Sequence, residues 1–244
     1  MVVSWLLVVP SVGSGDFAGA CGRANFSRVM PSFPFERREE YVVRDLGAGP
    51  PARDSRIKCY ARQLMRFPPT QGCAKFDVGR YNEHRPSMYA SEHYANQSNA
   101  IDGYDGARDW HVGLDLGAPP GTGVYAPLEG AVFGFGYNRA PLDYGGVVVT
   151  QHSLEGVDFW LLYGHLSAKS VLFKGVGDPI ARGQRIGSIG RTRENGGWPP
   201  HLHFQIALAR PSRPHDMPGV VSEAHLDQAL LDYPDPRLIV GPVY

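Results

Sequence analysis

Cysteine is scarce in this chain. Only Cys21, Cys59 and Cys73 occur among 244 residues. An odd number of cysteines indicates no disulfide framework, although it leaves a bridge between Cys59 and Cys73 open. A chain of this length can bury a substantial core without disulfide or structural metal staples.

An excess of charge of either sign is also missing. Lys and Arg together number 24, and Asp and Glu together also number 24. Without net charge, no long-range field attracts nucleic acid or an anionic membrane. We therefore expect neither as a partner.

The sequence has no apolar run of membrane-spanning length. Residues 1–9 are apolar, but residues 13–16 break the run, and the first basic residue is Arg23. The run is too short to cross a bilayer and lacks the positive flank of a signal peptide. Residues 18–21 resemble a lipoprotein cleavage site without its usual leucine, and Met30 is an alternative start. No signal peptide is convincing, so the compartment stays open.

Long amphipathic helices are absent between the short apolar runs. The 30 glycines and 21 prolines punctuate these runs, which favours a mainly β fold with tight turns. Residues 176–187 predict a hairpin that turns at residues 181–184. The predicted strands are residues 123–126, 130–135, 146–151, 158–163, 185–189 and 201–207.

The last predicted strand carries two histidines. Polar and apolar residues alternate from His201 through His203 to Gln205, so these three side chains share one face. Side by side on a strand, the two imidazoles can serve one metal, one as a ligand and the other beside it. A pair of surface histidines on an edge strand is the alternative.

A second pair of donors precedes a loop rich in glycine and proline. His111, Gly113 and Asp115 alternate with apolar residues, so a single strand places His111 and Asp115 on one side. Glycine and proline in and after this stretch argue against a helix. A turn-forming role for Asp115 is the alternative.

A fourth candidate histidine follows the apolar run of residues 159–162, which predicts a buried strand. His165 lies where that strand ends, so it can face the same cleft as the other histidines. Imidazole and carboxylate together are typical zinc ligands. Three protein ligands leave the fourth tetrahedral position to water, as in catalytic zinc sites.

Residues 108–207 resemble the lysostaphin-type zinc metallopeptidases, many of which cut peptidoglycan. The matching motifs keep their order and spacing, and they comprise His111-x-Gly113-x-Asp115, residues 120–127, 130–132, 163–167 and 183–190, and Pro200-His201-Leu202-His203-Phe204. The resemblance implies a compact antiparallel β barrel-like sandwich of the duplicated hybrid motif type, with a short N-terminal helix or loop extension. An open groove holds the metal in such a fold.

The resemblance also assigns roles to the histidines. It implies one Zn²⁺ per chain, held by His111, Asp115 and His203, with His165 and His201 as catalytic histidines. Zinc lowers the pKa of its bound water to about 7, and imidazole can take the water proton in that range. Which of His165 and His201 is the general base is left open. The chain has no His-Glu-x-x-His motif, which excludes a thermolysin-type site.

The function that this implies is a zinc metalloendopeptidase. We expect a monomer whose substrate is a peptide, with short Gly- or Ala-containing cross-links of peptidoglycan as the leading candidate. An extracytoplasmic location follows only if the substrate is cell wall. A non-hydrolytic zinc-binding module of the same fold is one alternative. A phosphocarrier with paired histidines is another, but it leaves Asp115 and the His-x-His motif of His201 and His203 without a purpose.

The remaining sequence predicts flanking segments around a domain of residues 101–210. Residues 1–29 form an N-terminal segment without an assigned structure, residues 30–100 an extension that wraps the domain, and residues 211–244 an extended C-terminal strap. Within the extension, residues 56–67 predict a short helix and residues 71–99 predict loops. The three other histidines considered are predicted to be structural or exposed: His84, His93 and His152.

Two predicted loops, residues 137–145 and 191–200, lie near the expected groove. Trp198 in the second loop either covers the core beside the histidine strand or packs on substrate, and the first interpretation is favoured.

Overall fold

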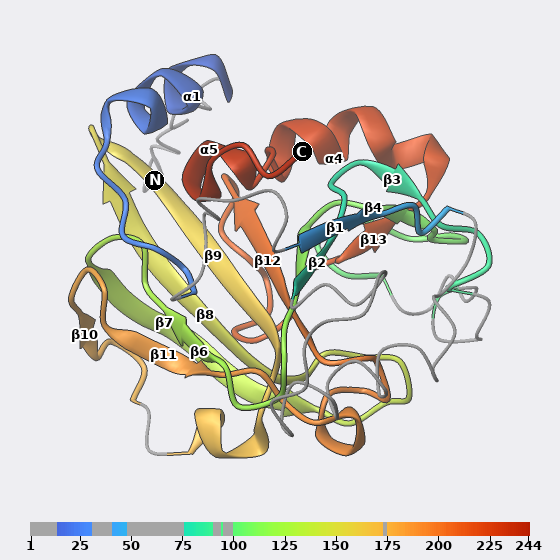
Figure 1. Ribbon diagram of the computed structural model, residues 1–244. Helices are drawn as coiled ribbons and strands as arrows, with labels where there is room; N and C mark the ends of the chain where they lie inside the picture. Colours follow the sequence, from blue (N-terminus) through green and yellow to red (C-terminus); the bar gives the residue numbers. More distant parts are fainter. Residues whose placement is uncertain (1–13, 31–40, 48–75, 90–93, 95–99, 173–174) are drawn as a thin grey trace, which may run out of the picture.

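A computed structural model describes residues 14–30, 41–47, 76–89, 94, 100–172 and 175–244. Its largest element is a mixed sheet of eight strands in the order β1-β2-β5-β12-β9-β8-β7-β10 (Figure 1). Two smaller sheets pair β11 with β6 and β13 with β4 and β3. The mainly β fold is therefore confirmed. Within the described ranges, no helix has both the length and the apolar character needed to cross a bilayer.

The strands are mostly short, and β7, β8, β9 and β12 are the longest. Their bounds are β1 (Tyr41–Arg44), β2 (Phe76–Gly79), β3 (Glu83–His84), β4 (Trp110–His111), β5 (Leu114–Gly117), β6 (Gly123–Tyr125), β7 (Gly130–Asn138), β8 (Gly145–Leu154), β9 (Val157–Leu166), β10 (Pro179–Ile180), β11 (Arg185–Ser188), β12 (His201–Ala207) and β13 (Val220–Val221). All six strands predicted from apolar runs are present, with ends that differ by up to three residues.

Both faces of the central strands are buried, which explains their continuous apolar runs. In β9, Leu161 and Tyr163 join one core cluster, whereas Trp160 and Leu162 join a second cluster on the opposite face. In β12, Leu202, Phe204 and Ile206 are fully buried in the first cluster. The other face of β12 carries the polar residues His201, His203 and Gln205, and ends on Ala207, which joins the second cluster.

Two local predictions are wrong. Residues 111–115 do not form one strand, because Val112 and Gly113 separate β4 from β5, and these strands belong to different sheets. The predicted hairpin has its turn, in which the Gln184 N–H donates to the Ala181 carbonyl at 2.9 Å. Its arms find other partners, however, since β10 pairs with β7 and β11 pairs with β6.

The segment before residue 100, predicted to form loops, also supplies strands to two of the sheets. β2 pairs with β5 inside the large sheet, and β3 pairs with β4. These strands are short and polar in part, so their sequence lacks the alternation of a typical strand. The predicted helix of residues 56–67, along with His93, Cys59 and Cys73, lies outside the described residues.

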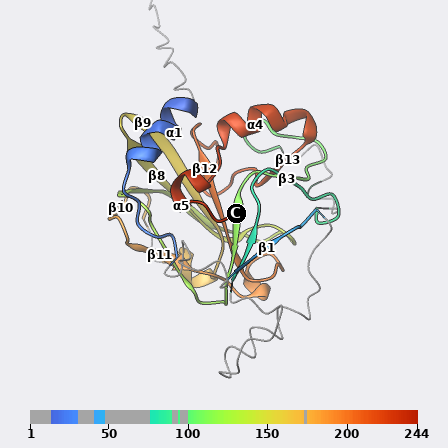
Figure 2. The same cartoon turned by 45° about the horizontal axis from the view of Figure 1, so that its top comes forward.

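Helices gather at one end of the molecule. The α-helices α1 (Ser14–Arg23), α4 (Leu226–Asp232) and α5 (Arg237–Val240) lie at the same end in both views (Figures 1 and 2). Phe17 of α1 packs on Phe159 of β9, with ring centroids 5.0 Å apart. The C-terminal strap is therefore not extended, because apolar residues such as Ala229 and Ile239 fold into helices that bury them.

Three short 3-10 helices complete the described elements: η3 (Ala168–Val171), η4 (Thr192–Glu194) and η5 (Glu223–His225). His152 is buried and hydrogen-bonded to Thr150 and the Glu129 carbonyl, whereas His84 is exposed and stacks on Trp110. Both agree with the structural and surface roles predicted for them.

Candidate metal centre

Strand register brings together residues that are far apart in the sequence. β12 lies between β5 and β9, and His203 is directly opposite Asp115 on one side and Gly164 on the other. Cross-strand neighbours in these positions project their side chains to the same face. His203 and Asp115, 88 residues apart, are therefore placed in contact.

His111 reaches this face from the smaller sheet. It ends β4, where it pairs with Glu83 of β3 and Val220 of β13. Gly113 in the following link has no side chain to obstruct the site: a Cβ there would lie 2.3 Å from His203 Cε1. The glycine of the motif thus leaves the space that the His203 ring occupies.

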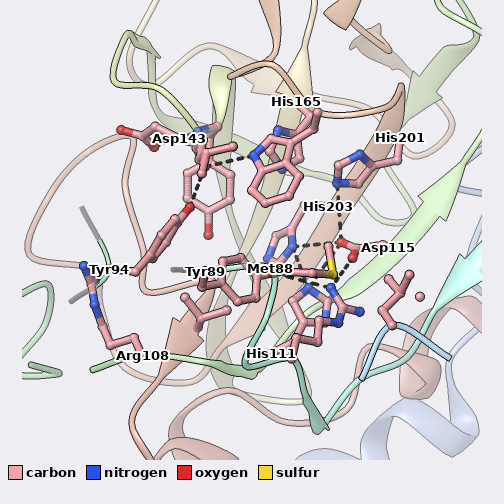
Figure 3. A pocket seen from close by; sticks show the side chains of 18 of the residues that line it. Met88, Tyr89, Tyr94, Arg108, His111, Asp115, Asp143, His165, His201 and His203 are labelled. Carbon is pink, nitrogen blue, oxygen red and sulfur yellow. Dashed lines mark hydrogen bonds and ion pairs between the residues drawn. The ribbon is translucent and has the colours of Figure 1, made fainter. Parts of the chain in front are cut away.

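Three donor atoms converge in the buried cluster of His111, Asp115 and His203 (Figure 3). His111 Nε2 is 3.1 Å from His203 Nδ1 and 3.2 Å from Asp115 Oδ1. His203 Nδ1 is also 3.1 Å from Asp115 Oδ1. A candidate ligand atom from each residue lies within 4.8 Å of the other two, close enough to share one cation.

The hydrogen bonds on the far side of each ring fix which nitrogen faces the cluster. His111 Nδ1 donates to the Arg80 carbonyl at 2.8 Å, so its Nε2 carries the lone pair in the neutral ring. His203 Nε2 donates to Gln205 Oε1 at 2.9 Å, while the Gln205 amide nitrogen donates to the Pro218 carbonyl at 3.2 Å. His203 Nδ1 therefore also presents a lone pair.

Two imidazole lone pairs and a carboxylate oxygen thus point at one another. Such a set repels itself unless a proton or a cation lies between the atoms. Nitrogen and oxygen donors in this mixture suit zinc. The residues present therefore fit a divalent metal of this kind.

Electrostatics keep His111 and Asp115 in the protonation states that metal binding needs. Burial and nearby Arg85 lower the pKa of His111 to about 4, so its ring is neutral at pH 7. Burial alone would raise the pKa of Asp115, but His111, Arg85 and His201 together lower it well below its usual value. The carboxylate is therefore ionised.

His165 and His201 stand beside the donor cluster. Their ring centroids are 4.2 Å apart, and His201 Nε2 is 3.7 Å from Asp115 Oδ1. Each Nδ1 donates to a backbone carbonyl, that of Asn195 for His165 at 3.0 Å and that of Pro199 for His201 at 2.7 Å. Each Nε2 consequently carries a lone pair in the neutral ring and can accept a proton.

The backbone at His165 is held in an uncommon conformation. Its φ is +58°, in the left-handed region that non-glycine residues rarely adopt. The His165 N–H donates to the Tyr144 carbonyl at 3.0 Å, and its own carbonyl accepts from the Gly190 N–H at 2.9 Å. Burial, followed by neighbouring His201 and His203, lowers the pKa of His165 well below its usual value.

All five sequence-predicted residues line one pocket of about 840 Å³, part of which is open to solvent. Both predicted loops also line it, through Leu142, Asp143 and Tyr144 from one loop and Trp198 and Pro199 from the other. Figure 3 shows Arg108 and Tyr94 at the opposite end of this pocket from Asp115. The pocket therefore combines histidines, aromatic rings and charges of both signs.

Trp198 is a packed wall of this pocket. It is 9% exposed, and its indole N–H donates to the Leu142 carbonyl at 2.9 Å. Its ring lies 5.8 Å from that of Tyr89 and 6.4 Å from that of His165. These contacts link the two loops that border the histidines.

We expect Trp198→Ala to reduce the free energy of unfolding by about 3 kcal/mol or more, because it empties a buried aromatic site. Trp198→Phe keeps most of the ring and loses one hydrogen bond, which costs about 1 kcal/mol. Denaturant unfolding of both variants measures these losses. Unchanged stability with a raised KM would instead show that the indole chiefly contacts substrate.

Sequence reasoning missed two residues that hold the cluster. Gln205 was placed on the correct face, but its hydrogen bond to His203 was not predicted. Arg85, which contacts Asp115, falls in a segment predicted to be loop, and no local pattern marks it. The pairing of β3 with β4 and of β2 with β5 brings that segment to the site.

A mainly β fold with a buried His–Asp–His cluster and two adjacent histidines defines a metallohydrolase type of domain. Residues 109–214 match the model of Peptidase family M23. This part of the chain is therefore similar to the metallopeptidases of family M23.

The chain is also similar to proteins with assigned names. DD-carboxypeptidase/endopeptidase Mpg of Neisseria meningitidis serogroup B is 35% identical over 98 residues, which cover 40% of this chain and 20% of Mpg. The chain thus matches only about a fifth of the length of this curated relative.

Solved structures give matches with low overall superposition scores. The catalytic domain of lysostaphin from Staphylococcus simulans is 25% identical, with a TM-score of 0.38, covering 61% of this chain and 89% of that one. Csd3 of Helicobacter pylori is 29% identical, with a TM-score of 0.30, and the match covers 45% of this chain and 27% of Csd3.

Proposed function

We propose that the chain is a zinc-dependent endopeptidase that cleaves peptide cross-links of peptidoglycan. His111, Asp115 and His203 would hold one zinc ion per chain. The observation that carries this proposal is the convergence of two imidazole lone pairs and one carboxylate oxygen at 3.1–3.2 Å.

When bound, zinc supplies Lewis-acid polarisation of the scissile carbonyl and a hydroxide nucleophile at neutral pH. The chain itself supplies two proton acceptors, His165 Nε2 and His201 Nε2. Because backbone carbonyls hold both Nδ1 atoms, the two rings keep one tautomer and orientation. A protonated ring can then return the proton to the leaving amine.

The substrate class is proposed from the pocket and the relatives. Aromatic side chains of Tyr89, Tyr144 and Trp198, with Arg108 and Asp143, suit a short peptide that carries both apolar and charged groups. The name of the Neisseria relative favours a bond between two D-configured centres. Cleavage of cell wall would require the chain to act outside the cytoplasm.

Purified cell walls test this proposal. Zinc-loaded wild type and Asp115→Ala are incubated with walls that have direct D-alanyl cross-links and with walls that have pentaglycine bridges. Mass spectrometry then identifies new amine termini. We expect wild type to release products from the directly cross-linked walls, and Asp115→Ala to release none.

Other outcomes identify the alternatives. Release only from pentaglycine walls would keep the peptidase and reject the D,D bond. No release from any wall despite full zinc loading would favour a non-hydrolytic binding module. A chain that binds no zinc and becomes phosphorylated on histidine would be a carrier.

A further inference from the structure

Arg85 is the most completely buried charged residue near the donor cluster. The whole residue is 0% exposed, although it comes from outside the region that matches the peptidase family. A buried guanidinium needs hydrogen-bonding partners to offset its lost hydration. The identity of those partners indicates what Arg85 does.

One partner is the carboxylate of the donor cluster. Arg85 Nη1 donates to Asp115 Oδ2 at 2.7 Å. The other oxygen, Oδ1, is the atom that faces His111 and His203. The two oxygens of Asp115 are therefore divided between the guanidinium and the cluster.

Further contacts hold the guanidinium itself in place. Arg85 Nε donates to Glu83 Oε2 at 2.8 Å, and Nη2 donates to the Arg80 carbonyl at 3.1 Å. Glu83 Oε1 in turn accepts from the Leu46 N–H at 3.0 Å. A chain of contacts thus runs from Leu46, two residues after β1, through Glu83 and Arg85 to Asp115.

The backbone near the ion pair of Arg85 and Asp115 also fits closely around it. The Arg85 N–H donates to the Asp109 carbonyl at 2.8 Å, next to the strand that carries His111. Gly79 lies opposite Asp115, where a Cβ would come within 2.8 Å of Arg85 Nη2 and 3.0 Å of Asp115 Oδ2. A larger residue at position 79 would displace the pair.

We propose that Arg85 is a positioning residue for the metal centre, which keeps Asp115 Oδ2 out of the donor cluster and presents Oδ1 alone. Without Arg85 the carboxylate could turn and offer both oxygens to a bound cation, and the second oxygen would then compete with water as a ligand. The guanidinium also draws charge from the carboxylate, which leaves the cation more strongly acidic.

Cobalt substitution tests this assignment without reference to any substrate. Wild type, Arg85→Met and Arg85→Lys are loaded with Co²⁺, whose visible absorption weakens as the coordination number rises. We expect a weaker band for Arg85→Met than for wild type, and partial recovery for Arg85→Lys. Arg237→Met, which removes an arginine paired with Asp235 away from the site, should match wild type.

The activity readout rests on the proposed peptidase function. Turnover per bound zinc should fall about 10- to 100-fold in Arg85→Met, the range typical of residues that orient metal ligands, with KM changed less than about twofold. If wild type cleaves no substrate, the cobalt spectra and zinc dissociation constants still decide the role of Arg85. The two proposals can therefore fail separately.

An unchanged cobalt spectrum and zinc affinity in Arg85→Met would overturn the inference. So would equal thermal destabilisation of the metal-free and zinc-bound forms with no spectral change, which would mark a purely structural ion pair. If Arg85→Met does not fold, Glu83→Gln replaces it in the cobalt experiment. This substitution weakens the contact that holds Arg85 Nε and leaves the guanidinium present. It should weaken the cobalt band in the same direction, and a wild-type spectrum would count against the proposal.

Discussion

Replacing His203 with alanine is expected to remove bound zinc and peptidase activity together. His203 supplies one of three converging donors, and two protein ligands rarely retain zinc against dilution. We expect zinc to fall from about one ion to below about 0.1 per chain, and activity to fall about 1000-fold or more. Elemental analysis after dialysis and a hydrolysis assay measure the two losses.

Thermal unfolding provides a second measurement of the same change. A ligand at about 1000 times its dissociation constant adds about 4 kcal/mol to the stability of the state that binds it. Zinc should therefore raise the Tm of wild type and leave that of His203→Ala unchanged. His225→Ala is the matched control, because His225 is partly exposed and lies outside the cluster. Stoichiometric zinc in His203→Ala would remove this residue from the ligand set.

Replacing His165 is expected to separate zinc binding from turnover. His165 stands beside the cluster, with its ring centroid 6.3 Å from that of His203, and it is not one of the three converging donors. Loss of a positioned general acid or base typically costs about 100- to 10,000-fold in rate. We therefore expect full zinc content with kcat reduced by that factor.

The choice of substitution follows from the backbone. Because φ at position 165 is +58°, His165→Asn fits the left-handed conformation better than His165→Ala, and both should be compared. Metal analysis, kcat and KM are measured for each. If both variants keep zinc and turn over at the wild-type rate, His165 has no catalytic role. Loss of zinc in both would instead make it necessary for the metal site.

Much of the site could be predicted because its parts are local. The alternation of His201, His203 and Gln205 fixes one face of β12, and the structure shows His203 and Gln205 in contact on it. The apolar run before His165 predicted a buried strand that ends near this histidine, and β9 has this position. Predictions of this kind require only the local sequence pattern of a strand and no knowledge of its partners.

Other predictions failed where partners far away in sequence decide the structure. The turn at residues 181–184 forms as its residues dictate, but β10 and β11 pair with β7 and β6 instead of with each other. Pairing depends on which strand edges are available, and the turn sequence does not encode this. The C-terminal strap likewise folds into α4 and α5, because apolar residues there find a surface to cover.

The sequence by itself placed His201, His203 and Gln205 on one face of a strand, and its resemblance to the lysostaphin-type metallopeptidases singled out His111, Asp115 and His203 as candidate ligands. Only the tertiary structure decided how Asp115 divides its two oxygens. That division depends on Arg85, which is 30 residues away and held by β3, and a contact of this kind leaves no periodic trace in the sequence. Local geometry repeats along the chain, whereas a single buried ion pair does not.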